Sequence, residues 1–228
     1  MNGICSMVFR YGVVKGYCLR DVTQYYKGEL ETAKSTHLPT LINIDEIAEF
    51  LRSIQNYNGK IVSKTALQIS PYVFLRPNEL ATSKWEYIDF KKSHWLIPAE
   101  CMKMNREHLI PFPIQVRKLL RLLQAITGEG EFIFPSEKDN NKTMHSETVN
   151  KAIRRIKDGK YIGRMVSHGF RGMASTILNE NKFRSDVIER QLAHVENNQV
   201  RRAYNHAEYL KERTEMMQWY ADYLDGLK

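Results

Sequence analysis

Apolar residues recur with helical spacing along most of the chain. Ile47, Ala48, Leu51 and Ile54 fall on one face of a helix, and Asp45 is expected to cap its first turn. The same spacing, read together with the positions of proline and glycine, predicts further helices over residues 61–74, 77–83, 113–125, 146–157, 168–180, 185–192 and 207–224.

Two short apolar runs depart from this helical pattern. Residues 94–98 and 108–112 flank a polar tip at residues 102–107, which predicts two antiparallel strands joined by that tip. Residues 132–134 are expected in the buried core. The sequence therefore predicts a mainly α fold with one small antiparallel β-sheet.

The composition narrows the class of protein. The chain has 228 residues, of which 43% are hydrophobic and 26% charged, and this balance is typical of a globular protein rather than a disordered or fibrous one. Three unpaired cysteines argue against a disulfide framework or a cysteine-based zinc site. We see neither a run of transmembrane length nor a secretion-signal pattern, so we expect a cytoplasmic protein.

The positive charge is concentrated in one stretch. The formal net charge is +8, and residues 151–171 hold +6 of it, with Asp158 as their only acidic residue. Charge alone leaves two interpretations open, a solvated helix face or a stripe that contacts phosphates. The candidate DNA-binding residues in this stretch are Lys151, Arg154, Arg155 and Arg164.

The end of this basic stretch contains candidate residues for phosphate chemistry. Ser167 is expected to cap a helix on which His168 and Arg171 lie three residues apart, on one face near the N-terminus. That end of a helix favours an anion through its free amide groups. Taken alone, such a pair is more often a surface feature than a site.

The order of six residues along the chain strengthens the signal. Arg76 sits in the corner sequence LRPNEL, Lys103 sits in the hairpin tip MKMNREHLIP, and Gln191–His194 is followed ten residues later by a tyrosine. From about His37 onward, this series resembles the tyrosine recombinase (phage integrase) family, most closely the prophage and genomic-island integrases of the satellite-phage type. The six residues of the series are Arg76, Lys103, His168, Arg171, His194 and Tyr204.

The resemblance implies a catalytic-domain fold and a role for each residue. Arg76 and Arg171 would grip the scissile phosphate, and His194 would donate a further hydrogen bond to it. Tyr204 would attack the phosphate to give a 3′-phosphotyrosyl link, with His168 as its base. Lys103 would protonate the leaving 5′-oxygen. Neither a cofactor nor a metal is implied.

The family also implies partners and domain boundaries. We expect double-stranded DNA attachment sites, a tetramer on DNA, and accessory DNA-bending or directionality proteins. Residues 1–36 resemble only the end of a core-binding domain and a linker, and residues 37–228 resemble the catalytic domain, so the chain is expected to be a fragment. The remaining histidines are interpreted as structural or surface residues: His37, His94, His108, His145 and His206.

Two other functions remain open at this point. A type IB topoisomerase-like enzyme would share the transesterification but relax supercoils. A non-catalytic DNA-binding protein would keep only the scaffold. The last predicted helix bears on this choice, because recombinases of this family commonly dock a C-terminal segment on a neighbouring subunit. Its stripe Leu210, Met217, Ala221 and Leu224 is interpreted as a packing face.

Overall fold

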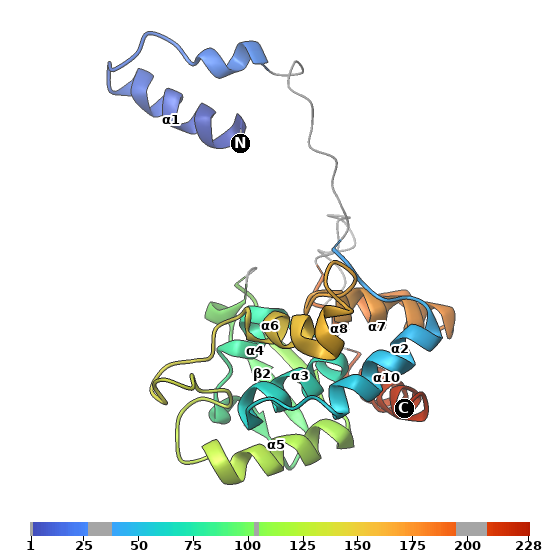
Figure 1. The fold of residues 1–228 in the computed structure, drawn as a ribbon. Coiled ribbons are helices and arrows are strands. Elements are labelled where there is room, and N and C mark those ends of the chain that lie inside the picture. Colours follow the sequence, from blue (N-terminus) through green and yellow to red (C-terminus); the bar gives the residue numbers. More distant parts are fainter. Residues whose placement is uncertain (1, 27–37, 103–104, 195–208) are drawn as a thin grey trace. The chain divides into compact units, whose positions relative to one another are not determined.

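The computed structural model describes residues 2–26, 38–102, 105–194 and 209–228. The chain forms two compact units, Met1–His37 and Leu38–Lys228. Figure 1 shows the elements of both units in chain order. The identity of the first unit as the end of a core-binding domain stays a prediction.

The first unit consists of helix α1 (Asn2–Val14) and the short helix η1 (Val22–Tyr26). Asp21 connects the two, because its buried carboxylate accepts hydrogen bonds from Ser6 at 2.7 Å and from the backbone and hydroxyl of Thr23 at 2.9 and 2.6 Å. These bonds lower the pKa of Asp21. The predicted linker beyond Tyr26 lies outside the described residues.

The second unit is mainly helical, as predicted. Its first helix, α2 (Ile44–Gln55), is capped by Asn43, whose side chain accepts hydrogen bonds from Asp45 and Glu46. The prediction that Asp45 caps this helix is therefore wrong, because Asp45 already lies inside the first turn. The other helices are α3 (Ile61–Val73), α4 (Pro77–Ala81), η2 (Trp85–Tyr87), η3 (Ala99–Cys101), α5 (Ile114–Thr127), α6 (Thr148–Arg155), η4 (Ile156–Gly159), α7 (Gly169–Glu180), α8 (Ser185–Gln191) and α10 (Leu210–Gly226).

The predicted hairpin is part of a three-stranded antiparallel sheet. The two expected strands are β2 (His94–Ile97) and β3 (His108–Pro111), and β1 (Ile88–Asp89) adds a short edge. Trp95 pairs with Ile110, and both side chains are fully buried. The expected fold, mainly α with one small antiparallel sheet, is confirmed.

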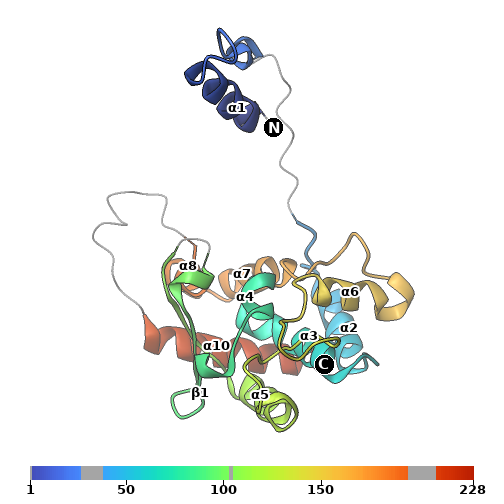
Figure 2. The ribbon, with the colours of Figure 1, turned by 90° about the vertical axis from the view of Figure 1, so that its left-hand side faces the viewer.

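Helix α10 completes the core from the C-terminal end. Its fully buried side chains include Met217, Ala221 and Leu224, so the packing face is confirmed for these three positions. Tyr220 lies between them and meets Phe74 edge to face, with ring centroids 5.1 Å apart. The helix contacts α3, α8 and β3 of its own unit (Figure 2). The described part of this segment therefore packs within the chain.

The first turn of helix α7 contacts Pro39 and Thr40, which lie at the start of the second unit. Ser167 does not cap it as predicted: the helix starts after His168, and the backbone N–H of Ser167 instead donates to Asn150 at 2.7 Å. The carbonyl of Gly169 accepts a hydrogen bond from Thr40 at 2.7 Å. A Cβ atom at Gly169 would lie 2.4 Å from the carbonyl oxygen of Pro39, so only glycine permits this close approach.

Candidate active site

Arg76 is held at the corner between α3 and α4 by one buried carboxylate. Glu79, which is only 4% exposed, accepts hydrogen bonds from the Arg76 backbone at 2.8 Å and from its guanidinium at 2.7 Å. Pro77 at the first position of α4 fixes the backbone direction after the corner. A third donor of Arg76 reaches the carbonyl of Ala193 at 3.3 Å. The guanidinium is thus oriented on a rigid corner.

Arg171 lies in the first turn of α7 and is 4% exposed. Its two terminal nitrogens donate to the carbonyls of Phe74 and Leu192, the second at 2.5 Å. Its Nε is buried and has no hydrogen-bond partner within the described part of the chain. Burial, and then the charge of Arg76, lowers the pKa of Arg171 to about 10, so it stays cationic at neutral pH.

His168 lies beside these two arginines. Burial lowers its pKa, and electrostatic interactions with Arg171, Arg76 and His194 lower it further. Arg76 donates to the carbonyl of Ala193 and Arg171 to that of Leu192, so both guanidiniums lie against the turn before His194, and the four residues form one cluster. A lowered pKa keeps the imidazole of His168 neutral at pH 7, which is the form that accepts a proton.

The end of α8 places His194 in the same cluster. Leu192 ends the helix, and Ala193 turns the chain through the left-handed region with a φ of 50°. The Nδ1 atom of His194 lies 2.7 Å from the carboxylate of Glu189, and its side chain is 45% exposed. The other ring nitrogen, Nε2, is not used in this contact and stays open to an outside partner.

Two further residues brace this turn, and sequence reasoning assigned neither to the site. His108 of β3 lies 3.0 Å from the carbonyl of Gln191, and burial lowers its pKa to about 3, so it remains neutral. Arg213 of α10 is fully buried, and it donates to the Gln191 side chain at 2.8 Å and to the carbonyl of Leu109. The sequence signal that could have identified Arg213 is a charged residue at a position of the apolar stripe of α10.

We expect Arg213→Leu to lower the free energy of unfolding by about 2–6 kcal/mol. The change removes the donor to the buried side-chain oxygen of Gln191 and to the part-buried carbonyl of Leu109, and each stranded acceptor costs about 1–3 kcal/mol. Urea unfolding followed by circular dichroism measures the loss. Lys211→Leu, at an exposed position of the same helix, is the matched control. An equal effect of both variants would contradict this role.

The structure thus brings together four of the six residues predicted from the sequence: Arg76, His168, Arg171 and His194. Lys103 and Tyr204 lie outside the described residues. The described segments on either side of Tyr204 are α8, which carries the turn before His194, and α10, which carries Arg213. The roles assigned to all six residues stay predictions.

The basic stretch before α7 lies on the surface, and acidic side chains engage part of it. Arg154 lies 3.6 Å from Glu147, and Arg164 lies 2.5 Å from Glu46. Lys151 and Arg155 are exposed and form no ion pair within the described residues. The four candidate DNA-binding residues are therefore accessible, but two of them already have partners.

No group of three His, Cys, Asp or Glu side chains among the residues that the structure describes is placed to hold a metal ion. None of the described helices combines the length and the apolar character that a membrane crossing requires.

Comparisons with known proteins identify relatives over nearly the whole chain. Prophage integrase IntA of Escherichia coli (strain K12) is 41% identical over 192 residues, which cover 84% of this chain and 46% of IntA. The integrase of Enterobacteria phage P4 is 40% identical over 235 residues, which cover 96% of this chain and 53% of that protein. The chain thus spans about half the length of these relatives.

The fold is similar to that of a solved recombinase. A lambda integrase tetramer bound to a Holliday junction matches with a TM-score of 0.62 and 16% identity, over 87% of this chain and 58% of that one. The model of the phage integrase family matches residues 41–211. The resemblance noted in the sequence is therefore confirmed, and the chain belongs to the phage integrase family of tyrosine recombinases.

Proposed function

We propose that the chain is the catalytic part of a site-specific DNA recombinase. It would cleave and rejoin DNA strands through a 3′-phosphotyrosyl intermediate, and so integrate or excise a prophage or genomic island. The observation that carries this proposal is the cluster of Arg76, Arg171, His168 and His194, contributed by separate segments of the chain. Two guanidiniums that stay positively charged, beside the neutral imidazole of His168, are suited to bind and cleave a negatively charged phosphodiester.

The arginines would stabilise the charge that the phosphate gains in the transition state. Two guanidiniums grip non-bridging oxygens without giving up protons. The buried Nε of Arg171 supports this role, because an unpartnered donor is costly unless a ligand uses it. Because Arg76 and Arg171 are already fixed by carboxylate and carbonyl contacts, little reorganisation is needed when charge develops.

The remaining groups would move protons. The phenol of Tyr204 has an ordinary pKa near ~10, so it needs a base as it attacks. His168 supplies a neutral imidazole for that purpose. The tyrosyl ester conserves the energy of the broken bond, so the strands rejoin without a nucleotide cofactor. As an imidazolium held by Glu189, His194 would donate its other ring N–H to the same phosphate.

The partners follow from this chemistry. Double-stranded attachment sites would be the substrate, and a tetramer would assemble on them, as in the lambda integrase tetramer on a Holliday junction. The apolar face of α10 packs on its own unit, so a neighbouring subunit would meet only the exposed polar face of this helix. Accessory DNA-bending or directionality proteins are proposed as well, and the place of action is bacterial DNA in the cytoplasm.

One plasmid assay separates this function from its two rivals. The substrate is a supercoiled plasmid with two direct copies of the repeat that bounds the element encoding the chain. Loss of the intervening segment, with covalent protein on 3′ ends, supports the recombinase. Relaxation without exchange would instead indicate a topoisomerase-like enzyme. Binding with neither reaction would indicate a DNA-binding protein on the same scaffold.

We expect Lys103→Ala to slow cleavage of an ordinary DNA strand and to be rescued by sulfur. The alkoxide leaving group needs a proton, whereas a 5′-bridging phosphorothiolate leaves as a thiolate and needs none. Cleavage rates on the two substrates measure the effect. Arg106→Ala is the comparison, because a guanidinium holds its proton too tightly to act as the acid. Rescue of the Arg106 variant alone would reverse the assignment.

A further inference from the structure

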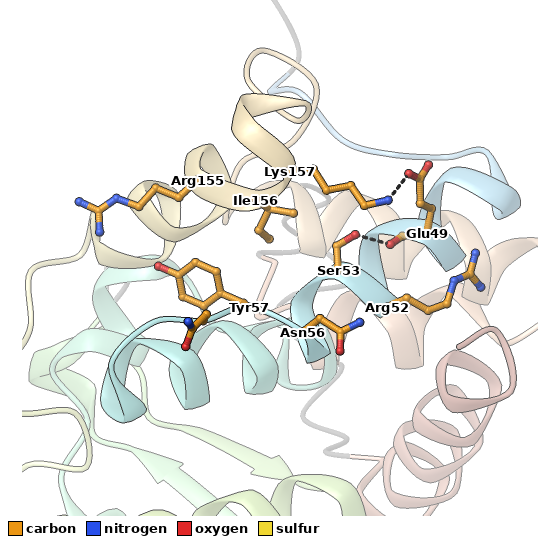
Figure 3. Close-up of a pocket in the computed structure, with 9 residues that line it drawn as sticks. Glu49, Arg52, Ser53, Asn56, Tyr57, Arg155, Ile156 and Lys157 are labelled. Carbon is orange, nitrogen blue, oxygen red and sulfur yellow. Dashed lines mark hydrogen bonds and ion pairs between the residues drawn. The ribbon is translucent and has the colours of Figure 1, made fainter.

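Three exposed basic side chains, placed between the start of η4 and α7, are all engaged by acidic residues of α2. Lys157 and Lys160 each place Nζ 2.6 Å from Glu49, and Arg164 lies 2.5 Å from Glu46. Figure 3 shows the Glu49–Lys157 pair beside a pocket of about 420 Å³ between α2 and η4. Every basic side chain on this short stretch that faces α2 is thus occupied by a carboxylate.

The backbone at Lys157 has an unusual conformation. Lys157 and Asp158 adopt left-handed angles, with φ of 44° and 51°, and Gly159 follows with a φ of 91°. Residues with a side chain seldom adopt this region, and where they do the surroundings impose it. Here the tight turn accompanies the convergence of two ammonium groups on one carboxylate of Glu49. Such a convergence of like charges requires an anion between them.

The anion in this position is exchangeable. The lysine side chains are 50% and 39% exposed and that of Glu49 is 32% exposed, and exposed ion pairs contribute little to stability. Hydrogen bonds from Lys157, and then from Lys160, lower the pKa of Glu49 to about 2, so it stays charged at neutral pH. A DNA phosphate offers the same charge, and its binding also releases condensed counterions.

Arg164 lies close to the candidate active site along the chain. It precedes His168 by four residues, so their Cα atoms are at most about 14 Å apart. A duplex carries one phosphate charge per about 1.7 Å of axis. A duplex with its scissile phosphate at Arg171 therefore presents several neighbouring phosphates to this surface.

We propose that Glu46 and Glu49 act as an internal substitute for DNA phosphates. They occupy Arg164, Lys157 and Lys160 in the free protein and give way to the DNA backbone when a duplex binds. The inference rests on the proposed function, which supplies the DNA. Its effect is to weaken binding to arbitrary sequences, since each released cation must first be taken from a carboxylate.

The test is the salt dependence of binding to a short fluorescent duplex of arbitrary sequence, measured by anisotropy with the whole chain. Glu49→Gln removes the carboxylate that DNA must displace from two lysines, so affinity at moderate salt should rise by at least about threefold, whereas the slope of log affinity against log salt should stay close to the parental value, because the same phosphate contacts form in both complexes. Glu46→Gln removes the competitor of one arginine and should raise the affinity by a smaller factor.

Two controls keep the result specific. Glu131→Gln removes the same charge from an exposed residue that pairs with Lys84 at 2.7 Å, and it should leave the affinity unchanged. Adding Lys157→Gln and Lys160→Gln to Glu49→Gln should remove the gain in affinity and make the slope shallower than the parental one by about 1.8, at about 0.9 per lost phosphate contact. Equal affinities for Glu49→Gln and Glu131→Gln would overturn the inference. A parent chain that binds no DNA even at low salt would instead overturn the proposed function.

Discussion

Replacing Tyr204 with phenylalanine is expected to abolish the covalent attachment of the chain to DNA. The substitution removes only the phenolic oxygen, so the fold should be unchanged while the nucleophile is lost. A nicked suicide duplex, built on the repeat that bounds the encoding element, traps the covalent complex for a denaturing gel. The parent should give a shifted band, and Tyr204→Phe should give none.

Tyr209 provides a matched control five residues along the chain. It is the first described residue after the segment that holds Tyr204, and its ring lies 5.0 Å from the guanidinium of Arg184. Tyr209→Phe removes the same atom from a neighbouring ring and should still form the covalent band. The opposite pattern, with attachment lost only in the Tyr209 variant, would move the nucleophile to that position.

Arg76→Ala is expected to slow cleavage by about 10²–10³-fold, because one charge-assisted donor to a developing oxyanion contributes about 3–4 kcal/mol. Binding should change far less, because other backbone contacts hold the DNA. Single-turnover cleavage and a binding titration on the same duplex separate the two effects. Arg121→Ala, at an exposed arginine of α5, is the control.

Arg171 calls for a different substitution, because it also supports the fold. It is buried and donates to the carbonyls of Phe74 and Leu192, so truncation to alanine would lower stability as well as catalysis. Arg171→Lys keeps the charge but loses the forked geometry, and we expect a comparable loss of cleavage with a smaller loss of stability. If both arginine variants cleaved DNA within a few-fold of the parental rate, Arg76 and Arg171 would not be the residues that grip the scissile phosphate.

The sequence was sufficient for the local elements. The period of apolar residues predicts the helices, and the two apolar runs around a polar tip predict β2 and β3. The cap of α2 was misassigned by two residues, because Asn43 and Asp45 are both good caps and only the backbone decides between them. The four clustered site residues could be predicted because their order along the chain resembles that of a known family.

The contacts between distant segments were beyond sequence reasoning. The basic stretch before α7 reads as a strongly positive surface, yet Glu49, which lies 108 positions before Lys157, pairs with two of its lysines. His108 reads as an isolated histidine, yet it touches Gln191, which lies 83 positions away. Such pairings depend on tertiary packing, and the periodicity of a single helix or strand carries no record of them.

The way in which the chain enters the second unit has a practical consequence for shortened or fused versions of the protein. The family match begins at residue 41, but the contacts that seat the chain against the first turn of α7 come from Pro39 and Thr40. Through these contacts the start of the unit is attached at Gly169, one residue from His168 and two from Arg171. A version cut at residue 41 would remove that anchorage, so the working boundary of the catalytic unit lies upstream of the boundary drawn by similarity.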